Sequence, residues 1–202
     1  MVLAGQFLER ATIIRNGDLA LEGLWHRGER APAVLLLSPL PGQGSMDAPA
    51  LNELAFALSR AGHPTLRFNY SGVGASPKAP RARRLPEARA AARVLRQSAG
   101  FASLVVVAFR SGAATALEVE PSAKALVLIS PPESLDLSRA VLSPSPVLFI
   151  LGQADPQRAR LANHCLQTGD RLQVIENADI PFNRGLPQLA QAVVEYLQEL
   201  GG

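Results

Sequence analysis

Residues 104–113 read LVVVAFRSGA, and this stretch decides how the rest of the chain is interpreted. Six apolar residues, from Leu104 to Phe109, are followed by Arg110, small residues and then apolar residues at helical spacing. A continuous apolar run of this length is typical of a strand that is buried on both faces of a sheet. The stretch therefore predicts a buried strand, a sharp turn that begins at Arg110, and a helix.

The same alternation extends over the whole chain. Strand-like runs are APAVLLLS (31–38), PTLRFNY (64–70), SLVVVAF (103–109), ALVLIS (125–130), SPVLFILG (145–152) and RLQVIE (171–176). Helical patterns cover 50–61, 85–98, 112–120, 156–167 and 186–200. Alternating strands and helices predict one α/β domain over residues 1–202, with a mostly parallel sheet of about seven or eight strands, helices on both faces and no large lid domain.

An antiparallel hairpin is expected before these units. The segments FLERATIIR (7–15) and LALEGLWH (19–26) flank Asn16-Gly17, a strong turn signal. In sheets of this kind ligands bind outside the carboxyl ends of the parallel strands. Function is therefore expected at 38–45, 70–76, 110–111, 130–133 and 152–156.

Composition describes a globular chain with one core. The chain has 202 residues, of which 48% are hydrophobic and 18% charged, as in folded rather than disordered proteins. No apolar run reaches the ~20 residues that cross a bilayer. The N-terminus lacks the features of a signal peptide, and the single cysteine, Cys165, has no partner for an internal disulfide. We therefore expect a cytoplasmic protein without a membrane contact.

The net charge of +3 is concentrated in KAPRARR, residues 78–84. Such a run predicts a solvated loop, or else a surface that docks an acidic partner. Aromatic residues make up 5% of the chain and do not interleave with these charges, which disfavours nucleic acid as the partner.

Five segments at the predicted strand ends carry a resemblance to a known superfamily. They are SPLPGQGSMD (38–47), LRFNYSGVGASP (66–77), VVVAFRSGAA (105–114), PVLFILGQADP (146–156) and NADIPFNRGLPQL (177–189). In this order they resemble the α/β-hydrolase superfamily, and within it the small bacterial hydrolases that carry a His-Pro-x-Pro turn after the third strand. The similarity covers about residues 30 to 200.

The resemblance implies a catalytic triad, and the sequence departs from it at two positions. In the nucleophile pattern G-x-S-x-G, Ala108 and Gly112 take the small positions and Arg110 takes the nucleophile position. Asp155 matches the acid, and Ile180 stands where the family has its histidine. Without nucleophile and base only a residual rate from binding and the oxyanion hole is expected. The sequence thus predicts a hydrolase fold without hydrolase chemistry.

An active serine hydrolase with a rearranged nucleophile is the alternative. A register slipped by one residue would make Ser111 the nucleophile, and Ser38 in the first turn is another serine at this edge. Either serine needs a base within hydrogen-bond reach. None of the three histidines, His26, His63 and His164, is expected at the catalytic edge, and Cys165 is interpreted as a small hydrophobic residue.

A degenerate site favours a binding or interaction module, with an unknown protein or a small anionic ligand as partner. Arg110 is expected to form an ion pair with Asp155, or to hold a phosphate or carboxylate together with the N–H groups at the start of the 112–120 helix. The candidate ligand-binding residues are Ser38, Leu40, Arg110, Ser111 and Asp155, where Ser38 and Leu40 replace the two histidines of the family's turn. No metal or cofactor is expected. The apolar stripe of 186–200 is expected to pack on the sheet or to extend into a homodimer contact.

Overall fold

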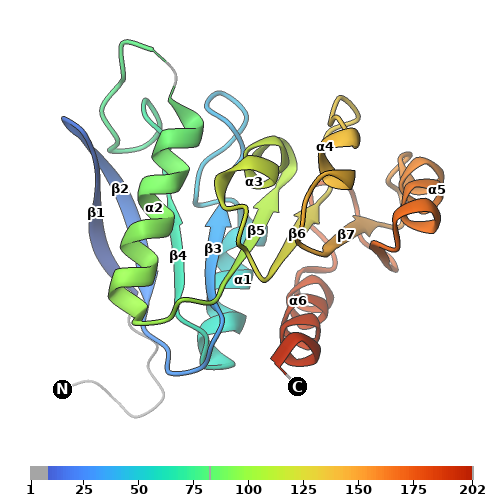
Figure 1. Cartoon of the computed structure of the whole chain (residues 1–202). Coiled ribbons are helices and arrows are strands. Elements are labelled where there is room, and N and C mark those ends of the chain that lie inside the picture. Colours follow the sequence, from blue (N-terminus) through green and yellow to red (C-terminus); the bar gives the residue numbers. More distant parts are fainter. Residues whose placement is uncertain (1–8, 82, 202) are drawn as a thin grey trace.

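The computed structural model describes residues 9–81 and 83–201, which form an eight-stranded sheet flanked by helices (Figure 1). The strand order is β1-β2-β4-β3-β5-β6-β7-β8. β1 and β2 form an antiparallel hairpin, β2 pairs antiparallel with β4, and all later pairs are parallel. The strands are β1 (Arg10–Asn16), β2 (Leu19–His26), β3 (Ala33–Leu37), β4 (Thr65–Phe68), β5 (Leu104–Phe109), β6 (Ala125–Ile129), β7 (Val147–Gly152) and β8 (Arg171–Ile175).

Helices cover both faces of this sheet. They are α1 (Pro49–Arg60), α2 (Arg84–Ala99), α3 (Ala113–Val119), α4 (Ser138–Val141), α5 (Arg158–Thr168) and α6 (Leu186–Gly201), with a 3₁₀ turn, η1 (Arg110–Gly112), before α3. Buried residues of α1 and α6 form one hydrophobic core with one face of the sheet. Buried residues of α2, α3, α4 and α5 form a second core on the other face (Figure 1).

The central strands are apolar because both of their faces are covered. Every residue of β3, β5, β6 and β7 is buried, and side chains that alternate along each strand enter the two cores in turn. At the edge, β8 has only one buried residue, Ile175. Continuous apolar runs therefore mark the middle of the sheet and mixed runs its edges.

The predicted fold class is confirmed: the chain forms a mostly parallel α/β sheet with helices on both faces. The turn at Asn16-Gly17 joins β1 and β2 as expected, while Phe7 and Leu8 of the predicted first strand lie outside the described residues. The ends of the five predicted helices lie within two residues of the observed ones, and the short helix α4 was not predicted. Among the described residues, no helix has both the length and the hydropathy that a membrane span requires.

In the basic segment 78–84, Lys78, Arg81 and Arg83 lie in the connection between β4 and α2, and Arg84 is the first residue of α2. Lys78, Arg81, Arg83 and Arg84 are exposed, and none of them forms an ion pair with another described residue. The solvated loop expected from the charge run is what the structure shows in this part of the chain.

Candidate functional site

The turn after β5 keeps the sharp geometry expected of a nucleophile elbow. Arg110 has φ of +54°, a left-handed conformation that costs an L-residue about 1–2 kcal/mol. Phe109 before it is extended, with φ of −104°, and Ser111 is not among the described residues with positive φ. The strained tip of the turn is therefore Arg110, and the slipped register with Ser111 at the tip does not occur.

Small residues on both sides of the tip allow the turn to lie against its neighbours. A Cβ atom added to Gly112 would be 2.6 Å from the carbonyl oxygen of Ser38 and 3.0 Å from that of Leu37. These are backbone atoms of β3 and its following residue, so they cannot move aside as a flexible side chain would. Ala108 is completely buried two residues before Arg110. The G-x-S-x-G spacing thus has a steric basis here, although arginine stands in its centre.

A pocket of about 200 Å³ opens in front of this turn. Its lining comes from connections that follow β3, β5, β6, β7 and β8, at the carboxyl edge of the sheet. Four residues singled out from the sequence lie on it together: Arg110, Ser111, Asp155 and Ile180. The rest of the lining is Gln43, Ser130, Pro131, Pro132, Glu133, Pro156 and Gln157.

Asp155, at the position of the triad acid, is 3% exposed. Its Oδ1 atom accepts a hydrogen bond of 2.9 Å from the Gln157 N–H, whereas its Oδ2 atom is buried without a hydrogen-bond partner. Gly152 at the end of β7 brings the histidine-position segment close, because a Cβ there would be 2.6 Å from the Asp179 carbonyl oxygen. The carboxylate therefore has one unpaired oxygen next to the segment that would carry its histidine.

Ile180 occupies the histidine position and is 38% exposed. An isoleucine side chain has no atom that accepts or donates a proton, so it leaves the Asp155 carboxylate without the imidazole that the triad arrangement requires. The described lining of the pocket contains no histidine.

The three histidines lie elsewhere and have structural partners. His26 contacts the Thr65 hydroxyl at 3.3 Å, and His63 contacts the Pro32 carbonyl oxygen at 3.1 Å. Burial lowers the pKa of both His26 and His63, which keeps these rings neutral. His164 lies 3.2 Å from Asp170.

Cys165 is half-buried and packs against the core on the α2 side. Burial, together with the nearby Asp170 carboxylate, raises the pKa of the Cys165 thiol to about 11. Because the thiolate is the nucleophilic form, this cysteine is a packing residue, as its sequence position suggested.

The expected ion pair between Arg110 and Asp155 is wrong. Arg110 is exposed, and no described carboxylate oxygen lies within 4.0 Å of its guanidinium nitrogens. Both residues line the pocket, but Arg110 is exposed whereas Asp155 is 3% exposed. The helix that follows, α3, has only seven residues, so the contribution of its dipole to anion binding is small.

Ser111 makes a specific contact with the first loop. The Leu40 N–H donates a hydrogen bond of 2.9 Å to the Ser111 hydroxyl oxygen, and Ser111 is 7% exposed. Ser38 is buried away from the pocket lining, and its hydroxyl donates to the Phe68 carbonyl oxygen at 3.3 Å. Of the five candidate ligand-binding residues, Arg110, Ser111 and Asp155 line the pocket, whereas Ser38 and Leu40 do not.

Of the seven lining residues that were not singled out individually from the sequence, Ser130 and Glu133 carry a hydroxyl and a carboxylate. Ser130 follows β6 with φ of +40°, is 4% exposed, and has a buried hydroxyl without a partner. Glu133 is exposed three residues later. Both lie in the strand-end range 130–133, so the rule that sites form at carboxyl ends was the signal that located them.

Comparison with protein-family models and with curated proteins gives no match. Solved structures do match over nearly the whole chain. A serine hydrolase without a lid from Xanthomonas campestris is 22% identical, with a TM-score of 0.77, and covers 95% of this chain and 94% of its own. Dienelactone hydrolase from Anabaena variabilis is 20% identical, with a TM-score of 0.78 and coverage of 96% and 98%.

An esterase from Pyrococcus furiosus is similar in the same way, with 16% identity, a TM-score of 0.80 and coverage of 97% and 94%. The chain therefore has the α/β-hydrolase fold, in the form that lacks a lid. At these identities the likeness establishes the fold and not the activity.

Proposed function

We propose that this protein is a catalytically degenerate α/β-hydrolase-fold protein that binds a ligand or partner at its pocket without hydrolysing it. The observation that carries the proposal is Arg110 at the strained tip of the elbow, with φ of +54°. An arginine side chain stays protonated in proteins and cannot act as the nucleophile that this position requires.

Two further features support a site without catalytic activity. One is the absence of a histidine from the described lining of the pocket, which has Ile180 at the base position. The other concerns the oxyanion hole, which this fold builds partly from an N–H of the loop after the first parallel strand. The Leu40 N–H in that loop donates to Ser111 Oγ instead, so it is not free for a substrate oxygen.

The described lining carries one cation, Arg110, and two carboxylates, Glu133 and Asp155, and the free Arg110 guanidinium is the group that favours a small acidic group as the bound species. The Arg110 guanidinium has no carboxylate partner among the described residues and lies at the exposed side of the pocket. A volume of about 200 Å³ suits a carboxylate or phosphate group with a short chain, or one acidic side chain of a protein partner. A charge-assisted, bidentate contact to Arg110 would hold that group.

A serine hydrolase that uses Ser111 is the second candidate. It is favoured by the named activities of the similar structures, which are a serine hydrolase, a dienelactone hydrolase and an esterase, and by the place of Ser111 on the pocket. It would require the Ser111 hydroxyl to leave the Leu40 N–H and to find a base.

Labelling by a fluorophosphonate probe separates the two candidates. The purified chain is expected to remain unlabelled under conditions in which a serine hydrolase of this fold is labelled completely. Labelling that disappears in Ser111→Ala would establish the alternative. Labelling that persists in this variant would show that another residue is the nucleophile, and would contradict the binding proposal as well.

Binding is tested in parallel with inorganic phosphate and acetate by thermal denaturation. Either anion is expected to raise the melting temperature of the wild type, and Arg110→Gln is expected to abolish that rise. Arg158→Gln is the matched control, because Arg158 is a surface arginine outside the pocket lining. A rise that is equal in Arg110→Gln and the wild type would remove Arg110 from the proposed role.

A further inference from the structure

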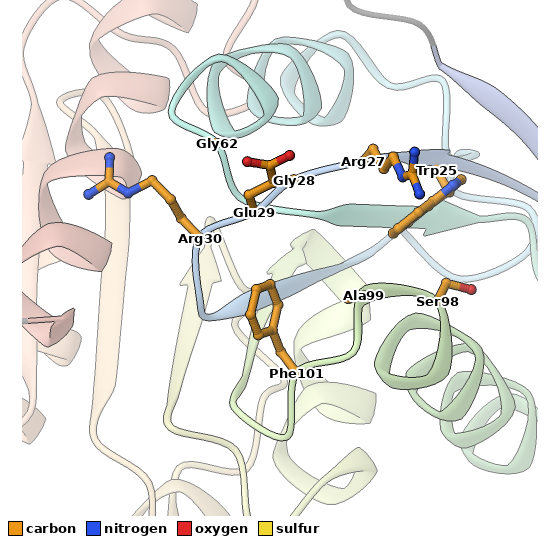
Figure 2. Close-up of a pocket in the computed structure, with 9 residues that line it drawn as sticks. All are labelled: Trp25, Arg27, Gly28, Glu29, Arg30, Gly62, Ser98, Ala99 and Phe101. Carbon is orange, nitrogen blue, oxygen red and sulfur yellow. The ribbon is translucent and has the colours of Figure 1, made fainter.

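A second and larger pocket lies at the opposite edge of the sheet, where the parallel strands begin. Its volume is about 780 Å³, within the range of small-molecule sites. The lining comes from the end of β2 and the loop before β3, from the turn before β4, and from the end of α2 and the residues before β5. These residues are Trp25, Arg27, Gly28, Glu29, Arg30, Gly62, Ser98, Ala99 and Phe101 (Figure 2).

The wall of this pocket is held by backbone contacts. The N–H groups of Glu29 and Arg30 both donate to the Gly62 carbonyl oxygen at 2.9 Å. At Gly28 an added Cβ would be 2.3 Å from the Pro64 nitrogen and 2.4 Å from the Gly62 carbonyl oxygen. The loop before β3 therefore lies directly on the turn before β4, and only glycine fits at the contact. These backbone contacts hold this wall of the cavity in place.

Two aromatic rings contribute to the pocket although aromatic residues are only 5% of the chain. Trp25 is the single tryptophan, is half-buried, and packs against the core beneath α2. Phe101 is half-buried in the connection between α2 and β5. Half-buried rings that face a cavity offer apolar surface on which a flat ring can stack.

The two arginines of the pocket differ in whether their side chains are free to bind a ligand. Arg30 donates to the Ala61 carbonyl oxygen at 3.2 Å, and Figure 2 shows its side chain directed away from Trp25 and Arg27. Arg27 is exposed, its side chain makes no hydrogen bond or ion pair within the described chain, and it is drawn at the same end of the pocket as Trp25 (Figure 2). A free guanidinium next to an indole ring is suited to an anionic group attached to a ring.

We propose that this pocket binds a small molecule in which a planar ring carries an acidic group. The ring packs between Trp25 and Phe101, and the carboxylate or phosphate receives charge-assisted hydrogen bonds from Arg27. The Glu29 carboxylate, which is exposed and also without a partner in the described chain, accepts a hydrogen bond from an N–H or O–H of the ligand. This site lies at the opposite edge from the Arg110 pocket and does not depend on the function proposed for it.

The single tryptophan gives a direct readout, because its emission reports on Trp25 alone. Adenosine 5′-monophosphate and benzoate represent the two sources of such a ligand, a nucleotide and an aromatic acid. Adenosine and inorganic phosphate supply the ring and the anion separately. We expect a saturable change in emission with at least one of the two ring-bearing acids, and with either separate part only at concentrations about tenfold higher or more.

Variants decide whether the binding occurs at this pocket. Arg27→Gln is expected to weaken the binding of the ring-bearing acid about tenfold while leaving that of adenosine unchanged, and Phe101→Leu is expected to weaken both. Arg158→Gln, a surface arginine that lines neither pocket, is the control and should leave the titration unchanged. The proposal is overturned if neither acid alters the emission, if phosphate alone binds as well as the ring-bearing acids, or if Arg27→Gln has no effect.

Discussion

Replacing Arg110 by glycine should stabilise the protein, although it removes a long side chain from the centre of the candidate site. Arg110 has φ of +54°, which is unfavourable for any L-residue with a Cβ atom but not for glycine. The side chain forms no ion pair with a described residue, so its removal breaks no charged contact. Relief of strain is therefore the main effect of Arg110→Gly on the folded state.

The size of this effect follows from two opposing contributions. A left-handed conformation costs an L-residue about 1–2 kcal/mol, while glycine makes the unfolded chain more flexible at a cost of roughly 0.5–1 kcal/mol. The net gain is about 0.5–1 kcal/mol, which corresponds to an increase in Tm of about 1–4 °C for a domain of this size. Arg110→Ala is the matched control, because alanine removes the guanidinium but keeps the Cβ atom and the strain.

Urea denaturation of the three proteins measures these differences directly. Arg110→Gly should have a higher midpoint than both the wild type and Arg110→Ala, with an unchanged slope. A lower midpoint for both variants would show that the Arg110 side chain makes a stabilising contact in solution. A lower midpoint for Arg110→Gly than for Arg110→Ala would show that the backbone at residue 110 is not strained, because only the flexibility cost of glycine would remain, and the assignment of this residue to the elbow tip would fail.

Three other predictions concern the elbow, the triad and the pH dependence. Gly112→Ala should destabilise the fold by about 3 kcal/mol, because its Cβ would lie 2.6 Å from the Ser38 carbonyl oxygen. Gly201→Ala is the control, since no atom lies within 4 Å of its added Cβ. Equal urea midpoints for these two variants would disprove the close contact at Gly112. The double variant Arg110→Ser, Ile180→His should hydrolyse p-nitrophenyl acetate at close to the background rate, because the Leu40 N–H still donates to Ser111 Oγ and is not available to a substrate oxygen. Strong turnover would show that the two substitutions alone complete the catalytic arrangement. Stability should fall as the pH drops below about 6.5, because the pKa values of His26 and His63 are lowered in the folded state and the unfolded chain therefore binds protons first. His63→Gln should reduce the slope of the unfolding free energy against pH by up to about 1.4 kcal/mol per pH unit. An unaltered slope would contradict a neutral, buried His63 ring.

The fold was predictable because both faces of its central strands are buried. A run such as Leu104 to Phe109 has no polar position, and in a chain with helical segments on either side it fits only the middle of a layered sheet. The hairpin was predictable for a different reason, since Asn16-Gly17 supplies the left-handed turn conformation that a tight connection needs. Each of these signals is local, and local signals are sufficient to define the strands and helices.

The direction of the Arg110 side chain was not predictable in the same way. The resemblance places Arg110 at the nucleophile position and Asp155 at the acid position of one triad, which suggested an ion pair once the histidine between them is replaced. In the structure Asp155 lies in the buried wall and Arg110 at the exposed side of the pocket. Pairing would bring the guanidinium into the wall, where the loss of hydration offsets much of the Coulombic attraction. Proximity at a sheet edge predicts which residues share a pocket, but not which of them touch.

The pocket around Trp25 could not have been found from the strand-end rule, because it lies where the parallel strands begin. Its parts come from three connections that are distant in sequence, near residues 27, 62 and 100. The signal that was present is the pair of glycines Gly28 and Gly62, whose backbones meet at the contact between two loops. Neither glycine has a periodic pattern around it, so the contact is visible only in three dimensions.

Asp155 supports the proposal that the candidate site is a degenerate catalytic arrangement. A buried carboxylate oxygen without a hydrogen bond destabilises a fold, typically by about 1–3 kcal/mol or more, and Oδ2 of Asp155 is such an atom. In a complete triad the histidine would donate to this carboxylate and remove that cost. The side chain at the corresponding position, Ile180, has no donor. Under the proposed function, the unpaired Asp155 oxygen is a remainder of an arrangement with a histidine, and the alternative is a structural need of the present fold. The Gln157 N–H, which donates to Oδ1 at 2.9 Å, supplies the remaining reason for an acceptor at residue 155. A single acceptor is enough for that contact, and Asp155→Asn keeps this acceptor while removing the buried charge. We expect its urea midpoint to equal or exceed that of the wild type, and a clearly lower midpoint would show that the present fold needs the carboxylate.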